Sequence, residues 1–162
     1  MKNIAAKRIS KDLRLLLEDV TASSEGKNRC VTQSAVIIAV DVENVYSWVL
    51  KAKAPAASVY GGADRVYELT VLFSVDYPHD PPTVRFLTPI YSPLVTKEGV
   101  ICDQMVRINW TPDMQASDAV RLVLDRVFSQ YNKHHEDDVY PEARHCLENC
   151  PEDYAERVRR GR

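Results

Sequence analysis

The sequence predicts one domain spanning residues 1–162, of the α/β class in its α+β form. We expect an N-terminal helix, a four-stranded antiparallel meander sheet, a central helix packed on that sheet and two C-terminal helices. Three observations predict this order. An amphipathic helical pattern opens the chain, four β-type runs with turn clusters between them follow, and beyond residue 111 the apolar spacing returns to the helical period. A chain of 162 residues is long enough to bury a core without disulfides or metals.

The first helix is expected over about residues 3–19, because its apolar residues recur at helical spacing. Its apolar face consists of Ile9, Leu13, Leu16, Leu17 and Val20. Its opposite face carries Lys7, Arg8, Lys11 and Arg14. The polar, glycine-containing residues 21–29 then predict the end of the helix and a loop.

Four runs rich in β-branched and aromatic residues predict the strands, at 36–40, 47–54, 66–75 and 83–88. In the third run the alternate residues from Tyr67 to Val75 are apolar, which indicates a strand with one buried face. The following YPHDPP, residues 77–82, has three prolines, which remove backbone donors and fix φ. This segment therefore predicts a rigid loop.

A broad apolar stripe between Ala116 and Tyr131 predicts the central helix, and Pro141 and Pro151 mark the first turns of two shorter helices. Between Val84 and Ile108 the sequence has little regular pattern. An irregular stretch of that length inside a compact domain usually carries function.

Composition narrows the class of protein. A formal charge of -2 with mixed signs argues against nucleic acid as the main partner. The basic ending RVRRGR is interpreted as cations at a helix C-terminus, with a docking or nucleic-acid role as the alternative. Without a long apolar run or a signal-type start, we expect no membrane association and a location in the cytosol, the nucleus or both.

Four cysteines, at positions 30, 102, 146 and 150, would stay reduced in those compartments. Cys146 and Cys150 are four residues apart and are expected to line one buried helix face. Cys102, beside a glycine turn, is by its residue type a small core residue. Its place in the long irregular segment favours a reactive thiol instead, because reactive groups concentrate on loops.

Several ordered motifs around Cys102 resemble the ubiquitin-conjugating enzymes over about residues 5–160. The motifs are KRISKDL in the first helix, the YPHDPP loop, VRFLTPIY, GVIC with its cysteine, and NWTP. Their spacing agrees as well, since Cys102 lies eight residues after the family's asparagine position and eight before Trp110. Ordered motifs at matching intervals are far more specific than one short pattern.

The resemblance implies that Cys102 accepts ubiquitin or a ubiquitin-like modifier as a thioester from an activating enzyme and, with a ligase, passes it to a lysine of a protein substrate. Thioester exchange needs a thiolate as the attacking group. No cofactor and no metal is implied, and a monomer is expected. The YPHDPP loop and the ending EDYAERVRRGR also look like members that carry a Nedd-type modifier, so the modifier stays open.

The family motif His-Pro-Asn is altered to Ser92-Pro93-Leu94. The family's asparagine supports a loop or steadies the tetrahedral oxyanion, and leucine donates no hydrogen bond. Losing one such donor costs about 100- to 1000-fold in rate. Transfer to lysine is therefore expected to be weak unless another donor substitutes; the candidates are Gln104, Asn109 and Thr96.

The resemblance also assigns an acid that faces the cysteine. Counting back from Pro141 places it at Asp137, with Asp138 or Glu136 as alternatives. Such an acid would orient the incoming ammonium. A metal site at His134, His135, Asp137 and Cys146 is not expected, because the spacing does not give two zinc-type ligand pairs.

Partner surfaces carried over from the family are Arg8 and Lys11 for the activating enzyme, and His79 and Pro112 for a ligase. A solvated helix face explains the two basic residues equally well. Two other functions stay open. Leu94 suggests a catalytically weak or inactive variant that binds ubiquitin or a partner, and Cys102 with His79 or His145 would suggest a cysteine hydrolase, although no local signature of one is present.

Overall fold

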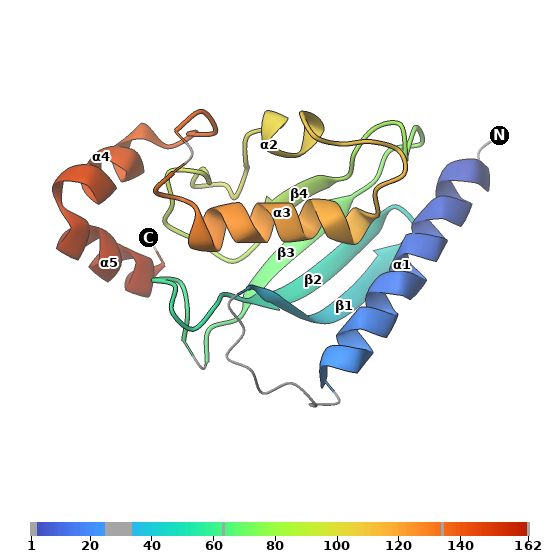
Figure 1. Cartoon of the computed structure of the whole chain (residues 1–162), viewed down its shortest axis with the longest axis horizontal. Coiled ribbons are helices and arrows are strands. Elements are labelled where there is room, and N and C mark those ends of the chain that lie inside the picture. The colour runs from blue at the N-terminus through green and yellow to red at the C-terminus, as the bar shows by residue number, and fades with distance from the viewer. Residues whose placement is uncertain (1–2, 25–33, 63, 134, 162) are drawn as a thin grey trace.

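The computed structural model describes residues 3–24, 34–62, 64–133 and 135–161. The elements in chain order are α1 (Asn3–Ser24), β1 (Val36–Asn44), β2 (Ser47–Lys53), β3 (Tyr67–Leu72), β4 (Thr83–Phe86), α2 (Gln104–Arg107), α3 (Ala116–Ser129), α4 (Pro141–Asn149) and α5 (Pro151–Arg160). Figure 1 shows α3 across one face of the sheet, α1 beside β1, and α4 and α5 at the opposite end. Among the described residues, no helix combines the length and apolar character that crossing a bilayer requires.

The sheet has the order β1-β2-β3-β4 with every neighbouring pair antiparallel, which confirms the predicted meander. Leu50, Leu69 and Phe86 stand opposite one another in successive strands and are all buried. The outer face is polar at the same level, where Lys51 pairs with Glu68 at 3.9 Å. Alternation along each strand thus buries one face and leaves the other in solvent.

The central helix α3 covers the buried face, as its apolar stripe predicts. The Phe128 ring packs near those of Tyr67 and Phe86, with centroids 5.0 Å and 6.2 Å away. At the start of α3 the side chain of Asp118 accepts the backbone N–H of Gln115 at 2.8 Å. A carboxylate at that position satisfies a free helix donor and complements the helix dipole.

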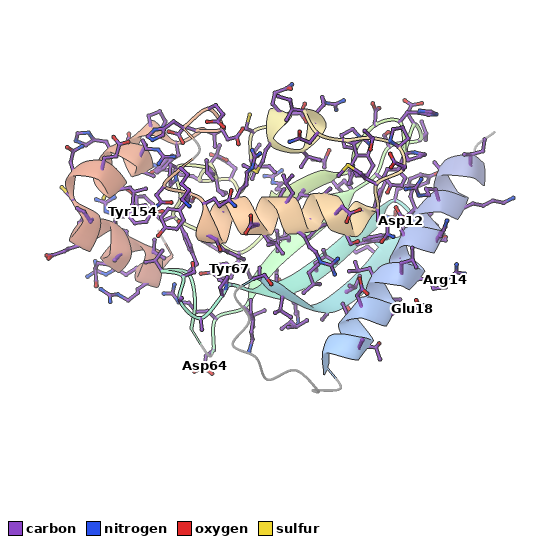
Figure 2. All side chains as sticks on the ribbon, in the orientation of Figure 1. Asp12, Arg14, Glu18, Asp64, Tyr67 and Tyr154 are labelled. Carbon is purple, nitrogen blue, oxygen red and sulfur yellow. The ribbon has the colours of Figure 1, made fainter. Side chains whose placement is uncertain are left out.

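A buried carboxylate joins α1 to the rest of the domain. Asp12 is 1% exposed, although it lies on a helix whose neighbouring turns are partly solvated. Its carboxylate accepts hydrogen bonds from the Arg8 Nε at 3.1 Å, from the Ala116 backbone N–H at 3.1 Å and from the Tyr77 hydroxyl. Figure 2 shows Asp12 on the side of α1 that faces α3, and Arg14 on the outer side. One side chain therefore ties together α1, the proline-rich loop and the start of α3.

Several element boundaries differ from the sequence predictions, including that of β1, which continues to Asn44 instead of ending at residue 40. The first helix continues past residue 19 to Ser24, and residues 25–29 of the expected loop lie outside the described part. The third strand ends at Leu72, short of the expected residue 75, although the Phe73 N–H still donates to the Tyr46 carbonyl at 2.9 Å. Val75, expected on the buried face, is consequently 67% exposed.

We predict that Asp12→Ala lowers the free energy of unfolding by about 3 kcal/mol, because it leaves three groups without their shared acceptor. Urea unfolding followed by tryptophan fluorescence measures this. Asp19→Ala is the matched control, since Asp19 lies on the same helix in an exposed pair with Arg121 at 3.2 Å. That variant should lose less than about 1 kcal/mol. Equal losses in the two variants would refute the role of Asp12.

Candidate functional site

A short hairpin at the sheet edge places Cys102. Val95 pairs with Ile101, and Val100 pairs with Arg85 of β4, so the hairpin extends the sheet. The Thr96 hydroxyl accepts the Val100 N–H at 3.0 Å and closes the turn. Thr96, a candidate donor in the sequence, thus holds the turn that precedes the cysteine.

Gly99 is required in this turn. Its φ of 87° lies in the left-handed region, and a Cβ there would stand 1.9 Å from the Phe86 carbonyl oxygen. Only glycine tolerates both the backbone conformation and the close approach. The glycine before the cysteine is therefore explained by the packing of the hairpin on β4.

Cys102 is half-buried and lines a groove of about 230 Å³. Its backbone carbonyl accepts the Met105 N–H at 3.1 Å, which starts the short helix α2 directly after it. The groove is lined by Leu72, Pro81, Pro82, Thr83, Val84, Arg85, Val100, Ile101, Cys102, Asp103 and Val106. Its apolar walls lead to the cysteine, which suits an extended peptide tail that ends there.

The other described cysteines are placed differently. Cys146 is buried, and this burial raises the pKa of its thiol, so the thiolate is disfavoured. Cys150 is exposed, because α4 ends at Asn149 and the chain turns before α5. The prediction that both line one buried face is thus wrong for Cys150. Cys30 lies outside the described residues.

The altered motif Ser92-Pro93-Leu94 is buried as a unit. The Ser92 hydroxyl accepts the Leu94 N–H at 3.1 Å, and the Leu94 side chain is 0% exposed within the core. The Pro93 carbonyl accepts the N–H groups of Val139 and Tyr140, at 2.9 Å and 3.1 Å. Two backbone hydrogen bonds therefore fasten the segment after Asp138 to this motif.

Two buried tyrosines lie beneath the motif. The Tyr60 hydroxyl donates to the Tyr91 carbonyl at 2.6 Å and also shares a hydrogen bond with the Tyr154 hydroxyl. Burial raises the pKa of both phenols, which keeps them as neutral donors. The sequence analysis missed this pair. No local pattern reveals it, since the two residues are 94 positions apart.

The acidic loop is held by two ion pairs. Asp137 is 4% exposed, and its carboxylate accepts from Arg126 of α3 at 2.5 Å. Asp138 accepts from Arg144 of α4 at two contacts, 2.8 Å and 2.6 Å. Glu136 is the exposed acid of the three. This geometry favours Asp137 as an anchor of the loop over an open carboxylate, so its expected role toward an ammonium stays a prediction.

The structure brings two of the expected partner-binding residues together. Arg8 donates to the Pro112 carbonyl at 2.7 Å and to the Met114 carbonyl at 2.5 Å, in addition to its pair with Asp12. Its guanidinium therefore supports the loop before α3. Lys11 is exposed on α1.

The proline-rich loop presents His79 to solvent. Trp110 holds this loop in place, because its indole N–H donates to the Pro78 carbonyl at 2.8 Å. Pro112 is exposed nearby in sequence, two residues after that tryptophan. The NWTP motif thus supports the loop that carries His79.

The remaining candidates are scattered. Gln104 and Asn109 are exposed, and His145 lies on α4 with Asn149 at 3.1 Å from its ring nitrogen. Within the described residues, no group of three His, Cys, Asp or Glu side chains is arranged to hold a metal ion, and His134 is outside that part of the chain. No described histidine is hydrogen-bonded to Cys102, as a hydrolase dyad would require.

Comparison with known proteins gives the family. A family model described as ubiquitin-conjugating enzyme matches residues 14–161. An Arabidopsis thaliana protein named "Probable ubiquitin-conjugating enzyme E2 31" is 29% identical over 124 residues, which cover 76% of this chain and 71% of that protein. A solved structure described as a ubiquitin conjugating enzyme from Trypanosoma cruzi is 62% identical, has a TM-score of 0.90, and matches over 98% of this chain and 99% of that one. The helix, meander sheet and C-terminal helices found here agree with these matches, and the chain belongs to the ubiquitin-conjugating enzyme family.

Proposed function

We propose that the protein accepts ubiquitin or a ubiquitin-like modifier as a thioester on Cys102 and transfers it, with a ligase, to a lysine amine. The observation that carries this proposal is the position of Cys102: half-buried at a groove, directly after an edge hairpin. A thiol in the core would not reach a protein-sized donor. Family membership supports the same chemistry.

The proposed reaction has two acyl transfers. The Cys102 thiol loses its proton, the thiolate attacks the carbonyl carbon of the modifier's thioester on the activating enzyme, and the activating enzyme's sulfur leaves as a thiolate that takes up a proton. A lysine amine then attacks the new thioester, an amide forms, and the Cys102 sulfur leaves as the amine loses its proton. Each step passes through a tetrahedral oxyanion, which donors near the thiol would stabilise.

Leu94 separates these two steps in our proposal. Its side chain lies in the core and carries no donor, so the oxyanion formed during lysine attack lacks the amide that the family provides there. In the family that amide also supports the neighbouring loop, and in this chain other contacts support it. The Pro93 carbonyl binds the loop backbone, and Arg126 and Arg144 bind its aspartates. Charging of Cys102 should therefore proceed while transfer to free lysine is slow.

The absence of a side-chain donor at Leu94 also favours a second function. If the missing donor abolishes transfer, the domain acts as a module that binds the modifier or an active conjugating partner. For partner contacts, Lys11 and His79 are exposed and are the candidates for the activating enzyme and the ligase, respectively. Arg8 and Pro112 support that surface through their mutual hydrogen bond.

We predict that incubation with activating enzyme, ATP and modifier gives an adduct that reductant removes and that Cys102→Ala abolishes. Gel mobility with and without reductant measures it. Cys150→Ala is the control, because Cys150 is an exposed thiol outside the groove, and it should charge normally. If ubiquitin and ubiquitin-like modifiers all fail to form the adduct, the binding module is the better function.

We predict that Leu94→Asn speeds lysine transfer, because it returns an amide donor to the position where the family provides one. The free energy of unfolding should fall by about 3 kcal/mol from the lost apolar packing and the unpaired polar group. Discharge of the charged protein onto free lysine, together with urea unfolding, measures both effects.

Leu94→Met is the matched control and should stay within about 1.5 kcal/mol of the parent. Unchanged lysine discharge by a folded Leu94→Asn variant would contradict the prediction, and would show that the leucine is not the cause of weak transfer.

Two roles for Asp137 predict different outcomes for Asp137→Asn. As an anchor, its loss leaves the Arg126 guanidinium without a charge partner, so stability falls by about 2 kcal/mol and charging and discharge decline together. As an acid that faces the thiol, its loss slows lysine discharge alone and shifts the pH dependence of discharge. We expect the first outcome. Glu136→Gln is the comparison, because Glu136 is the exposed acid of the loop and should leave stability unchanged.

A further inference from the structure

The basic C-terminal end lines a groove that the proposed chemistry does not use. Two adjoining hollows, of about 410 Å³ and about 240 Å³, share Pro89, Ile90 and Gly161 as a common wall. We call them together the α5 groove. The first is lined by Arg65, Val66, Tyr67, Thr88, Pro89, Ile90, Val158, Arg159, Arg160 and Gly161, and the second by Pro89, Ile90, Tyr91, Val95, Lys97, Tyr140 and Gly161.

We propose that the α5 groove binds an acidic segment of a partner protein that carries one or two apolar side chains. The charge of the lining carries this proposal. Arg65, Lys97, Arg159 and Arg160 line the groove, and none of the described lining residues is acidic. The whole chain, by contrast, has a formal charge of -2. A local excess of cations on an acidic protein favours a carboxylate-rich ligand.

The contacts that these cations make within the protein only partly neutralise their positive charge, so a ligand can still pair with it. Arg159 and Arg160 share a single carboxylate, that of Glu156, at 2.9 Å and 3.1 Å. The Arg65 guanidinium donates to the carbonyls of Val158 and Arg159 at the end of α5, so its partners there are neutral groups. This contact also keeps the helix end against residues 65–67, as Figure 1 shows for the C-terminus.

Lys97 stands at the other end of the groove. Its ammonium lies 5.8 Å from the centroid of the Tyr140 ring, and within the described residues no carboxylate is within ion-pair distance of it. Two acids close in sequence, Asp64 and Glu98, do not line either hollow. Figure 2 shows Asp64 at the tip of the loop before β3.

The walls of the groove are apolar and aromatic. Ile90, Tyr91, Val95 and Tyr140 surround the smaller hollow, and the Tyr91 and Tyr140 rings meet edge to face at 5.7 Å. An apolar side chain of a ligand would lose its water there, while carboxylates on either side meet the cations at the rim. Aromatic residues and Arg are enriched in protein interfaces, whose rim is polar. The overall negative charge of the chain disfavours a polynucleotide in the same place.

The groove lies beside the hairpin that carries Cys102. Val95 lies on one arm of that hairpin, Lys97 lies in its turn, and Ile101, the partner of Val95, lies on the other arm. Adjacent strands are about 4.8 Å apart, so the hairpin is on the order of 10 Å wide. A protein held in the α5 groove would thus lie close to the cysteine, although its binding does not require any thioester chemistry.

Fluorescence anisotropy of a labelled, glutamate-rich synthetic peptide with two central leucines tests the proposal on the uncharged protein. We expect saturable binding that weakens as salt is added, and roughly tenfold weaker binding by the Lys97→Glu/Arg160→Glu variant. Arg14→Glu/Lys133→Glu is the matched control, since these exposed cations line neither hollow, and it should bind as the parent does. Amide shifts in a nitrogen-15 NMR titration should map to residues 88–97 and 158–161.

Two further probes test whether an uncharged peptide or a nucleic acid binds in the same groove. The same peptide with glutamine for every glutamate should bind weakly, and a single-stranded oligonucleotide of similar length should bind no better than that glutamine peptide. The proposal is overturned by undetectable binding, by equal binding of the two peptides, by tighter binding of the oligonucleotide, or by unchanged binding after the charge reversal. Because no activating enzyme or modifier is present, these outcomes are independent of whether Cys102 forms a thioester.

Discussion

The buried carboxylate of Asp12 is the constraint on which the arrangement of this domain depends. It accepts hydrogen bonds from α1, from the tyrosine of the proline-rich loop and from the first turn of α3. Burying a carboxylate costs free energy unless donors such as these bind it. The three elements that supply the donors are therefore held in one relative position. Arg8, bound to the same carboxylate, extends the contact to the loop before α3. These hydrogen bonds therefore fix the positions of α1 and the two loops relative to one another.

A second set of long-range contacts fixes the region around Cys102. The hairpin before the cysteine is joined to β4, the Pro93 carbonyl holds the backbone after Asp138, and Tyr60 holds the Tyr91 carbonyl. Each contact links segments that are distant in sequence. Together they place a half-buried thiol at a groove while the neighbouring motif is sealed in the core. The site is thus rigid on its buried side and open on the side where a protein tail would enter.

The Ser92-Pro93-Leu94 segment and the acidic loop beside it are stabilised by different contacts. Leu94 fills core volume and Ser92 accepts the Leu94 N–H, so the segment is stabilised by packing and by a local hydrogen bond. The acidic loop that follows α3 is held by Arg126 and Arg144 instead of by a side-chain amide. Support of the loop and stabilisation of an oxyanion are therefore separable demands. The contacts of Pro93, Arg126 and Arg144 meet the first demand, support of the loop.

The sequence by itself determined the order of the helices and strands, the face that each buries and the cysteine to examine, because apolar periodicity, prolines and ordered motifs are local properties. Tertiary structure alone decided what the polar residues contact. Arg8 binds a carbonyl 104 positions away, Asp137 is neutralised by an arginine of α3, and Arg65, Lys97 and two arginines at the end of α5 line one groove. The partner of a charge or a hydrogen bond is set by which segments meet in space, and no local pattern encodes that meeting.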